Sequence, residues 1–287
     1  MTDQRPKSSA DIQPRPAATA TGGSSAFLFL LIATGLCFAV ASPAIFGAVS
    51  EEFVGLIVPA AQLTPFAAAV ALFLLLRPGR FGQVFALRWG GSWRAIGLGL
   101  ATVVLIGLIQ LGAGLAFGGY APNPTDAVLL AAVAVPVFLV LQSVFAIGEE
   151  FGWRGWLVSH LQERPFWQIA VVSAVFWMLW HVPALPLIMA DDWQVAAAYL
   201  LAIGSWAPFM VALRLYSGSV WPAVIIHGAL NSVRVFFTQS IASGSGVAWV
   251  VEILGWVLWI AAAWWLMSRA RKVGIHPSGM ARWAQGN

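Results

Sequence analysis

The feature that most constrains this chain is a series of long apolar runs repeated along most of its length. Most of them approach the ~20 residues that cross the hydrocarbon core of a bilayer as a helix. The runs cover eight stretches: 26–49, 54–76, 95–117, 126–148, 167–190, 194–213, 220–240 and 247–268. Because a helix satisfies its backbone hydrogen bonds internally, the runs predict an all-α polytopic membrane bundle of about eight transmembrane helices.

The composition supports a membrane protein. Charged residues make up 9% of the 287 residues and hydrophobic residues 60%, whereas a soluble domain carries about 25% charged residues. So few charges cannot cover a folded surface, which makes membrane lipid the expected partner. The formal net charge is +4, but the basic residues lie in short connectors between the runs, which argues against nucleic acid. Cys37 is the single cysteine, so no disulfide can form within the chain.

The distribution of Lys and Arg predicts the orientation of the bundle. With a cytoplasmic N-terminus, every Lys and Arg except Arg234 lies in a cytoplasmic connector or tail, and the opposite connectors carry acidic residues instead. We therefore expect a multi-pass protein of the cell membrane with both termini cytoplasmic. Residues 1–25 are expected to be a disordered cytoplasmic tail, 26–268 the transmembrane bundle, and 269–287 a second cytoplasmic tail.

Ionisable residues inside or beside apolar runs are candidates for function, because burying them in lipid is costly. The fourth run ends in such a group. At about 100° per residue, Glu149 and Glu150 cannot share one narrow helix face. Glu150 precedes Arg154 by four residues, the favourable order for an ion pair, and this leaves Glu149 free to face a neighbouring helix. The alternative is that the run ends here and these charges are solvated.

Two further segments each place a histidine four residues from a companion on the same helix face. In the fifth run Trp177 can pack against the imidazole of His181 and restrict its rotamer. In the seventh run His227 and Asn231 share a face. Taken singly, each pair fits a packing role.

Helix geometry brings the fourth and fifth runs together. If the fourth run continues as a helix to a turn near Arg164–Pro165, Glu149 lies 15 residues before this turn and His181 lies 17 residues after it. Both side chains then stand ~22–25 Å from the turn along antiparallel helices. His227 lies about ten residues after its own cytoplasmic connector, which permits a similar depth.

Together these residues resemble the three motifs of the CPBP intramembrane proteases. That family includes the type II CAAX prenyl proteases and bacterial bacteriocin-processing or immunity proteins. The resemblance covers roughly residues 125–240, the catalytic core, and Trp177 stands where the family usually has Phe. The three motifs are here Glu149-Glu150-xxx-Arg154, Trp177-xxx-His181 and His227-xxx-Asn231.

The resemblance implies an intramembrane endopeptidase whose active site opens towards the cytoplasm. Glu149 and His181 are expected to activate a water molecule, and His227 and Asn231 to stabilise the oxyanion. The rest of the first motif, Glu150 and Arg154, would fix the shape of the site, with Trp177 in support. The implied substrate is a membrane-associated or lipidated protein or peptide. The sequence sets neither the natural substrate nor the oligomeric state.

Other chemistries stay open at this point. Glu149, His181 and His227 would suit catalytic zinc, although no HExxH motif is present; the preferred mechanism requires no cofactor. A polytopic transporter could use the same buried groups to carry protons, but no inverted repeat is apparent. A non-catalytic membrane scaffold or immunity protein of the same fold is the third alternative, although a scaffold has no need of the four polar residues.

Arg234 is the one basic residue outside the cytoplasmic set. It lies near the turn between the last two runs, at a height that Glu252 can also reach. We expect the two to form an ion pair, since an unpaired charge is costly in lipid. Binding of a substrate carboxylate by Arg234 is the alternative.

Overall fold

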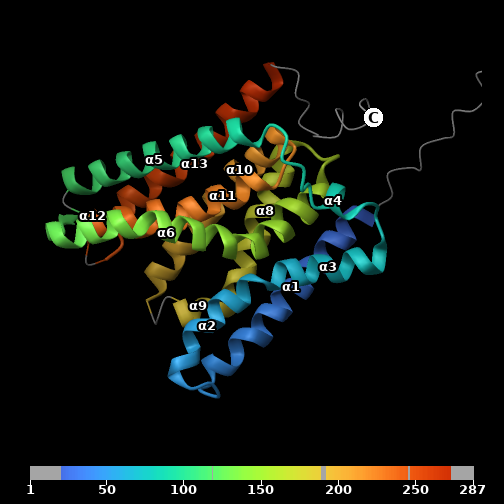
Figure 1. Ribbon diagram of the computed structural model, residues 1–287, viewed down its shortest axis with the longest axis horizontal. Helices are drawn as coiled ribbons and strands as arrows, with labels where there is room; N and C mark the ends of the chain where they lie inside the picture. Colours follow the sequence, from blue (N-terminus) through green and yellow to red (C-terminus); the bar gives the residue numbers. More distant parts are fainter. Residues whose placement is uncertain (1–20, 118, 189–191, 245, 273–287) are drawn as a thin grey trace, which may run out of the picture.

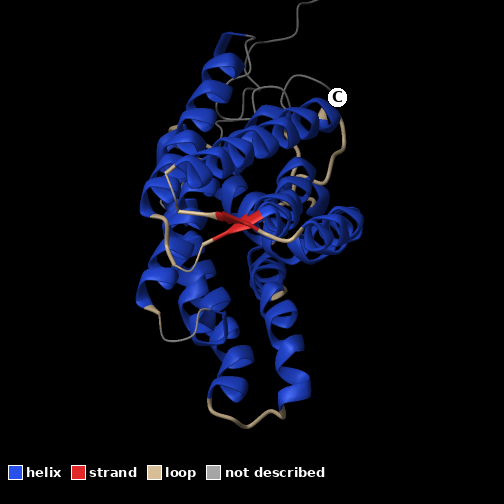
Figure 2. Cartoon of the chain, turned by 90° about the vertical axis from the view of Figure 1, so that its left-hand side faces the viewer, coloured by secondary structure: helices blue, strands red, loops and turns tan. Residues whose placement is uncertain are grey.

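The computed structural model describes residues 21–117, 119–188, 192–244 and 246–272. The chain is almost wholly helical (Figure 1). Within the described ranges the only strands are β1 (Ala121–Pro122) and β2 (Ala242–Ser243), which pair antiparallel (Figure 2). The all-α prediction is therefore confirmed, apart from this two-residue ladder.

The α-helices fall into long membrane-sized segments and short connecting turns. They are α1 Thr21–Ile45, α2 Glu51–Gln62, α3 Thr64–Leu76, α4 Phe81–Val84, α5 Ser92–Ala116, α6 Thr125–Glu150, α7 Val158–Leu161, α8 Phe166–His181, α9 Leu185–Ile188, α10 Trp193–Ser217, α11 Trp221–Ala229, α12 Thr238–Ile241 and α13 Trp249–Lys272. Three further segments have other helical geometries. They are the π-helices η1 Phe151–Leu157 and η3 Leu230–Phe237 and the 3₁₀ turn η2 Val182–Ala184.

Six helices of the described chain are long and apolar enough to cross a membrane. Helices α2 and α3 form a seventh candidate if they count as one span bent by 41°. The seventh predicted run, 220–240, is also helical but is more polar, because it carries His227, Asn231 and Arg234. A multi-pass helical membrane protein is thus confirmed, and the number of eight spans stays a prediction. Helix α1 begins at Thr21, inside the predicted tail of residues 1–25.

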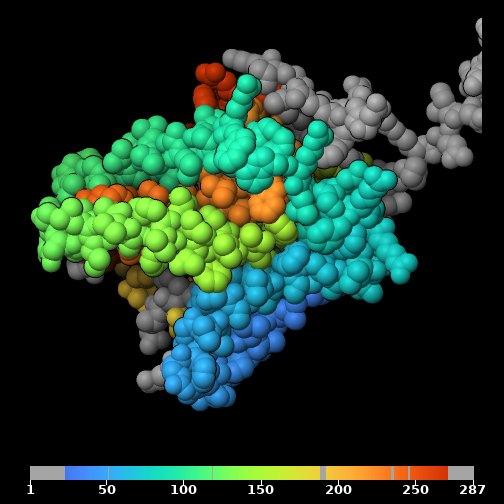
Figure 3. Space-filling model, in the orientation of Figure 1, coloured from blue at the N-terminus to red at the C-terminus, as the bar shows by residue number. Residues whose placement is uncertain are grey.

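Helix α10 is the centre of the bundle. In its most apolar stretch 61% of the residues are buried, against 11% to 39% in the other five single spans. It packs against α5, α8, α11 and α13. In Figure 1 α5, α6 and α11 run close to the long axis of the molecule, while α1 slopes away from them. Figure 3 shows α1 and α2 projecting from the lower side.

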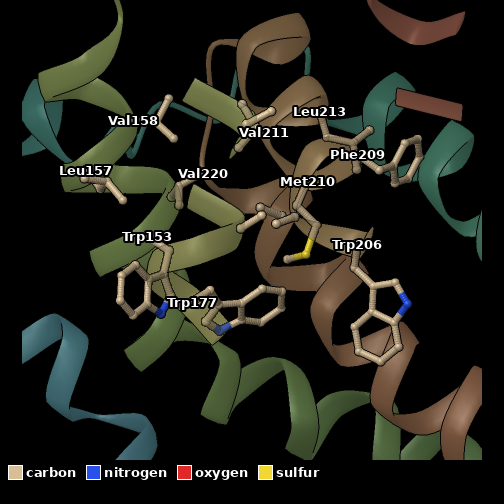
Figure 4. Close-up of a cluster of buried hydrophobic side chains, with 14 of the residues drawn as sticks. Trp153, Leu157, Val158, Trp177, Trp206, Phe209, Met210, Val211, Leu213 and Val220 are labelled. Carbon is tan, nitrogen blue, oxygen red and sulfur yellow. The ribbon is translucent and has the colours of Figure 1, made fainter. Parts of the chain in front are cut away.

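The outer face of α6 stays apolar and uncovered, as a lipid-facing helix requires. Val133 and Leu130 are 78% and 72% exposed, which would be unfavourable in water but suits a bilayer. The opposite side of the helices forms the core, where Trp153, Trp177 and Trp206 lie along one side of the side-chain cluster in Figure 4. Aromatic rings therefore fill much of the centre of the protein.

The predicted second span is interrupted between α2 and α3. Pro65 has no backbone N–H to donate to the carbonyl oxygen of Ala61, so the α-helix cannot continue through it unchanged. The hydroxyl of Thr64 donates to that carbonyl instead, at 2.7 Å. The indole Nε1 of Trp180 donates to Thr64 Oγ1 at 3.0 Å, which fastens the break to α8. Helix α2 consequently ends at Gln62, next to the first predicted motif.

The predicted helical hairpin is present. Helix α6 runs without interruption through η1 and α7 to Leu161, and α8 begins at Phe166 after Pro165. This confirms the turn near Arg164–Pro165 on which the common height of Glu149 and His181 depends.

Candidate active site

The carboxylate of Glu149 is held by two neutral donors from different helices. Gln62 Nε2 donates to Oε1 at 3.0 Å, and Trp177 Nε1 donates to Oε2 at 2.7 Å. The residue is 2% exposed. Glu149 therefore faces its neighbouring helices, as its position on the helix predicted, and it is not a solvated helix end.

Glu150 lies on the other face of the helix, where its carboxylate contacts the side chains of an arginine and a histidine. Its Oε1 accepts from Arg154 Nη1 at 2.8 Å, which confirms the predicted i,i+4 ion pair. The same oxygen lies 2.9 Å from Nδ1 of His227. Glu150 and Arg154 are completely buried, so each would be severely destabilising without the other.

Trp177 contacts both the carboxylate of Glu149 and the two residues, Arg154 and His227, that lie against Glu150. Besides donating to Glu149, its ring lies under the guanidinium of Arg154, with Cζ 4.2 Å from the ring centroid. The rings of Trp177 and His227 meet edge to face with centroids 5.3 Å apart. A phenylalanine at this position could keep the ring contacts but could not donate a hydrogen bond.

The tautomer of His181 follows from its backbone contact. Its Nδ1 lies 2.8 Å from the carbonyl oxygen of Trp177. A carbonyl oxygen can only accept, so Nδ1 carries the proton and Nε2 of the neutral ring keeps a lone pair. The ring of Tyr199 packs edge to face on the same imidazole at a centroid distance of 5.5 Å. The fixed ring presents a hydrogen-bond acceptor.

Asn231 lies at the start of η3, one turn beyond His227. Its Nδ2 donates to Oε1 of Gln142 at 3.2 Å, which leaves one amide proton of Asn231 for another acceptor. Both π-helices, η1 and η3, thus begin within two residues of a motif residue. Such wide turns are frequent at functional sites.

Glycines beside the motifs permit very close backbone packing. A Cβ on Gly148 would come within 2.5 Å of the carbonyl oxygen of Gln62. On Gly152 it would come within 2.8 Å of the backbone of Pro65, and on Gly228 within 2.7 Å of the backbone nitrogen of Ser143. These three contacts set the distance between the helices that carry the polar side chains.

Arg214 supports the first motif from α10. It was counted among the cytoplasmic connector residues, but the structure buries it to 7% exposure. Its Nε donates to the backbone carbonyl of Arg154 at 3.0 Å, and its Nη2 reaches Ser159 Oγ at 3.3 Å. Both bonds fix the path of the chain through η1 and α7.

The four predicted catalytic residues line one cavity. It has a volume of about 60 Å³, which is room for several water molecules at roughly 10–15 Å³ each. Glu149, His181, His227 and Asn231 contribute to its wall, and so do Gln62 and Tyr199. Trp177, Trp180 and Trp206 make up much of the remainder. A cavity of this size, lined by aromatic and polar side chains, suits a reaction between water and a peptide.

No three His, Cys, Asp or Glu side chains in the described part of the chain are grouped closely enough to hold a metal ion. Glu149, His181 and His227 share the cavity but do not converge on one point. His227 Nε2 and Glu149 Oε1 lie 4.0 Å apart.

The chain was compared with known protein families, which tests its resemblance to the CAAX proteases. Residues 129–233 match the family described as type II CAAX prenyl endopeptidase Rce1-like. The resemblance to the CAAX protease family is confirmed. The matched segment covers a little over a third of the chain and contains all seven motif residues. It supports a membrane protease, and so a hydrolase with a protein substrate. No match was found among curated proteins.

Other polar residues of this candidate site were not predicted. Gln62, Gln142 and Tyr199 contact the motif residues from α2, α6 and α10. A signal for Gln62 was present, since Gln62 and Thr64 are polar residues between Pro59 and Pro65 in an otherwise apolar run. The side chain of Arg234 lies outside the described residues, so its pairing with Glu252 stays a prediction.

Proposed function

We propose that this protein is an intramembrane endopeptidase that hydrolyses a peptide bond of a membrane-associated or lipidated protein. The observation that carries the proposal is the convergence of Glu149, His181, His227 and Asn231, from three separate helical segments, on one cavity. The family match supports a protease, and the arrangement of the site supports hydrolysis by an activated water molecule.

Glu149 serves as the general base. Neither of its oxygens is bonded to a permanent cation, since its donors are an amide and an indole, so the carboxylate keeps the capacity to take a proton. A water molecule between Glu149 and His181 gives one proton to the carboxylate and donates its other O–H to Nε2 of His181. The water oxygen then bonds to the scissile carbonyl carbon. A positioned base of this kind contributes typically about 10²–10⁴-fold to the rate.

His227 and Asn231 stabilise the negative charge that develops on the carbonyl oxygen of the scissile bond. The unused amide proton of Asn231 is a neutral donor. His227 already engages Glu150 through Nδ1, so its Nε2 donates when the ring carries both protons. Donors held in place before the reaction stabilise an oxyanion without reorganisation. The proton held by Glu149 passes to the departing amine nitrogen as the C–N bond breaks.

The substrate class rests on the family description. A CAAX motif is a C-terminal tetrapeptide whose cysteine is prenylated, and the family is described as acting on such proteins. A prenyl group would anchor the substrate in the membrane beside the bundle, and the cytoplasmic clustering of Lys and Arg argues for a site that opens towards the cytoplasm. We include in this proposal that the protein is located in the cell membrane.

The test uses an internally quenched peptide that ends in a prenylated CAAX sequence, with purified protein in neutral-lipid nanodiscs. Glu149→Gln should lower cleavage at least ~100-fold, because it removes the base, while its yield and melting temperature stay near wild type. Glu163→Gln, an exposed carboxylate, is the matched control. Cleavage retained by Glu149→Gln would reject the assignment.

A second experiment searches for the natural substrate. The membrane proteome of a deletion strain is compared with that of strains carrying wild-type or Glu149→Gln protein. Substrates are those that stay uncleaved in both the deletion and the variant. A transporter or scaffold would produce no such set.

A further inference from the structure

We propose that Gln62 is a positioning residue for the catalytic base, in the reaction proposed above. It lies 87 positions before Glu149 in the chain and on a different helix. The inference rests on the proposed function, because it concerns how Glu149 is held for catalysis. Its location is the break between α2 and α3.

The two donors of Glu149 divide its oxygens between them. Trp177 holds Oε2 from α8, and Gln62 holds Oε1 from α2. A carboxylate fixed at one oxygen can still rotate about its terminal bond, whereas one fixed at both oxygens cannot. The amide of Gln62 therefore sets the direction in which the remaining lone pairs of Glu149 point.

The position of Oε1 matters because His227 is close to it. Nε2 of His227 lies 4.0 Å from this oxygen, beyond the 2.7–3.2 Å of a hydrogen bond. Without the amide, Oε1 would turn to the histidine and form a direct ion pair. Such a pair would occupy the base and the oxyanion donor at once. Gln62 keeps the two groups close but separate.

The backbone around Gln62 is held by contacts on both sides of the helix break. Thr64, two residues later, donates to the carbonyl of Ala61 and accepts from Trp180. Gly148, directly before Glu149, lets the carbonyl oxygen of Gln62 approach α6 where any side chain would collide with it. The side-chain amide of Gln62 therefore extends towards Glu149 from a backbone that is held in place.

The test compares near-isosteric variants on the quenched prenylated peptide. Gln62→Met keeps the length and volume of the side chain but has no donor. We expect kcat to fall about 10- to 100-fold, the usual effect of a lost hydrogen bond to a charged group, with KM within about twofold of wild type. Leu63→Met, at an exposed neighbour on the same break, is the control and should behave as wild type.

A pH profile separates positioning from simple packing. In Gln62→Glu the new carboxyl can donate to Glu149 only when it is protonated. Its activity relative to wild type should therefore rise as the pH is lowered. If Gln62 acts only by filling space, Gln62→Glu should not become more active than Gln62→Met at low pH.

The outcomes distinguish this inference from the proposed function. If Gln62→Met retains wild-type kcat while Glu149→Gln is inactive, the positioning role is wrong and the proposed base stands. If Glu149→Gln itself remains active, Glu149 is not the base, and the proposed function is rejected together with the positioning role of Gln62. A kcat loss in Gln62→Met that matches a loss of folded protein, by melting temperature and yield, would also overturn the positioning role.

Discussion

Nδ1 of His227 lies 2.9 Å from Oε1 of Glu150. This contact joins the residue predicted as an oxyanion donor to the one predicted to fix the shape of the site. Because Arg154 shares the same carboxylate oxygen, one glutamate orients both a histidine and an arginine. The two adjacent glutamates therefore have different tasks: Glu149 faces the cavity, and Glu150 organises the groups behind it.

The first prediction separates the two carboxylates by stability. Glu150→Gln leaves Arg154 buried without its counter-charge, which typically costs about 3–5 kcal/mol when one partner of a buried pair is removed. We expect its yield and its melting temperature in detergent to fall well below those of Glu149→Gln. If the two variants accumulate equally and lose activity equally, both carboxylates act in the chemistry.

The second prediction concerns Trp177→Phe. The ring contacts with Arg154 and His227 can persist, but the hydrogen bond to Oε2 of Glu149 is lost. Cleavage of the quenched prenylated peptide should fall about 10-fold, since the bond is made to a charged group. The melting temperature should also fall, because Trp177 is almost completely buried and the smaller ring leaves a cavity, so cleavage is compared per folded protein. Trp167→Phe, on the exposed end of the same helix, provides the control. Unchanged kcat in Trp177→Phe would show that its indole N–H has no part in positioning Glu149.

The third prediction tests the close approach of α6 to the helix break. In Gly148→Ala the new Cβ would lie 2.5 Å from the carbonyl oxygen of Gln62 and 3.0 Å from Cα of Leu63. Backbone must move, so we expect a loss of about 1–3 kcal/mol in stability together with reduced cleavage.

Gly112→Ala is the matched control for this substitution. Gly112 lies in α5 and has open space around it, so its alanine variant should be neutral or up to about 1 kcal/mol more stable. Equal melting temperatures for Gly148→Ala and wild type would mean that the two backbones are not in contact.

The fourth prediction addresses metal dependence. If Glu149 and His181 activate water without an ion, purified protein should keep its cleavage rate after extensive chelation and dialysis. A rate that disappears on chelation and is restored specifically by zinc would instead make Glu149, His181 and His227 ligands. Metal content of the protein as isolated provides the independent measurement.

The sequence by itself determined the features that depend on local periodicity. Apolar runs of membrane length predicted the long helices, and four-residue spacing predicted the Glu150–Arg154 pair. Glu149 and His181 were predicted at one height because the rise of a helix per residue is constant. The motif residues, and the family resemblance they carry, were likewise readable without coordinates.

Only the tertiary structure decided which polar groups meet. Gln62 and Glu149 are 87 positions apart, and His227 and Glu150 are 77 apart, so no helical period connects them. The break that brings Gln62 to the site depends on Pro65, Thr64 and the distant Trp180. Arg214 had the sequence context of a connector residue, yet α10 carries it into the core. Side chains far apart in the chain are paired by helix packing and by the need to satisfy buried polar atoms, and neither is encoded in local sequence.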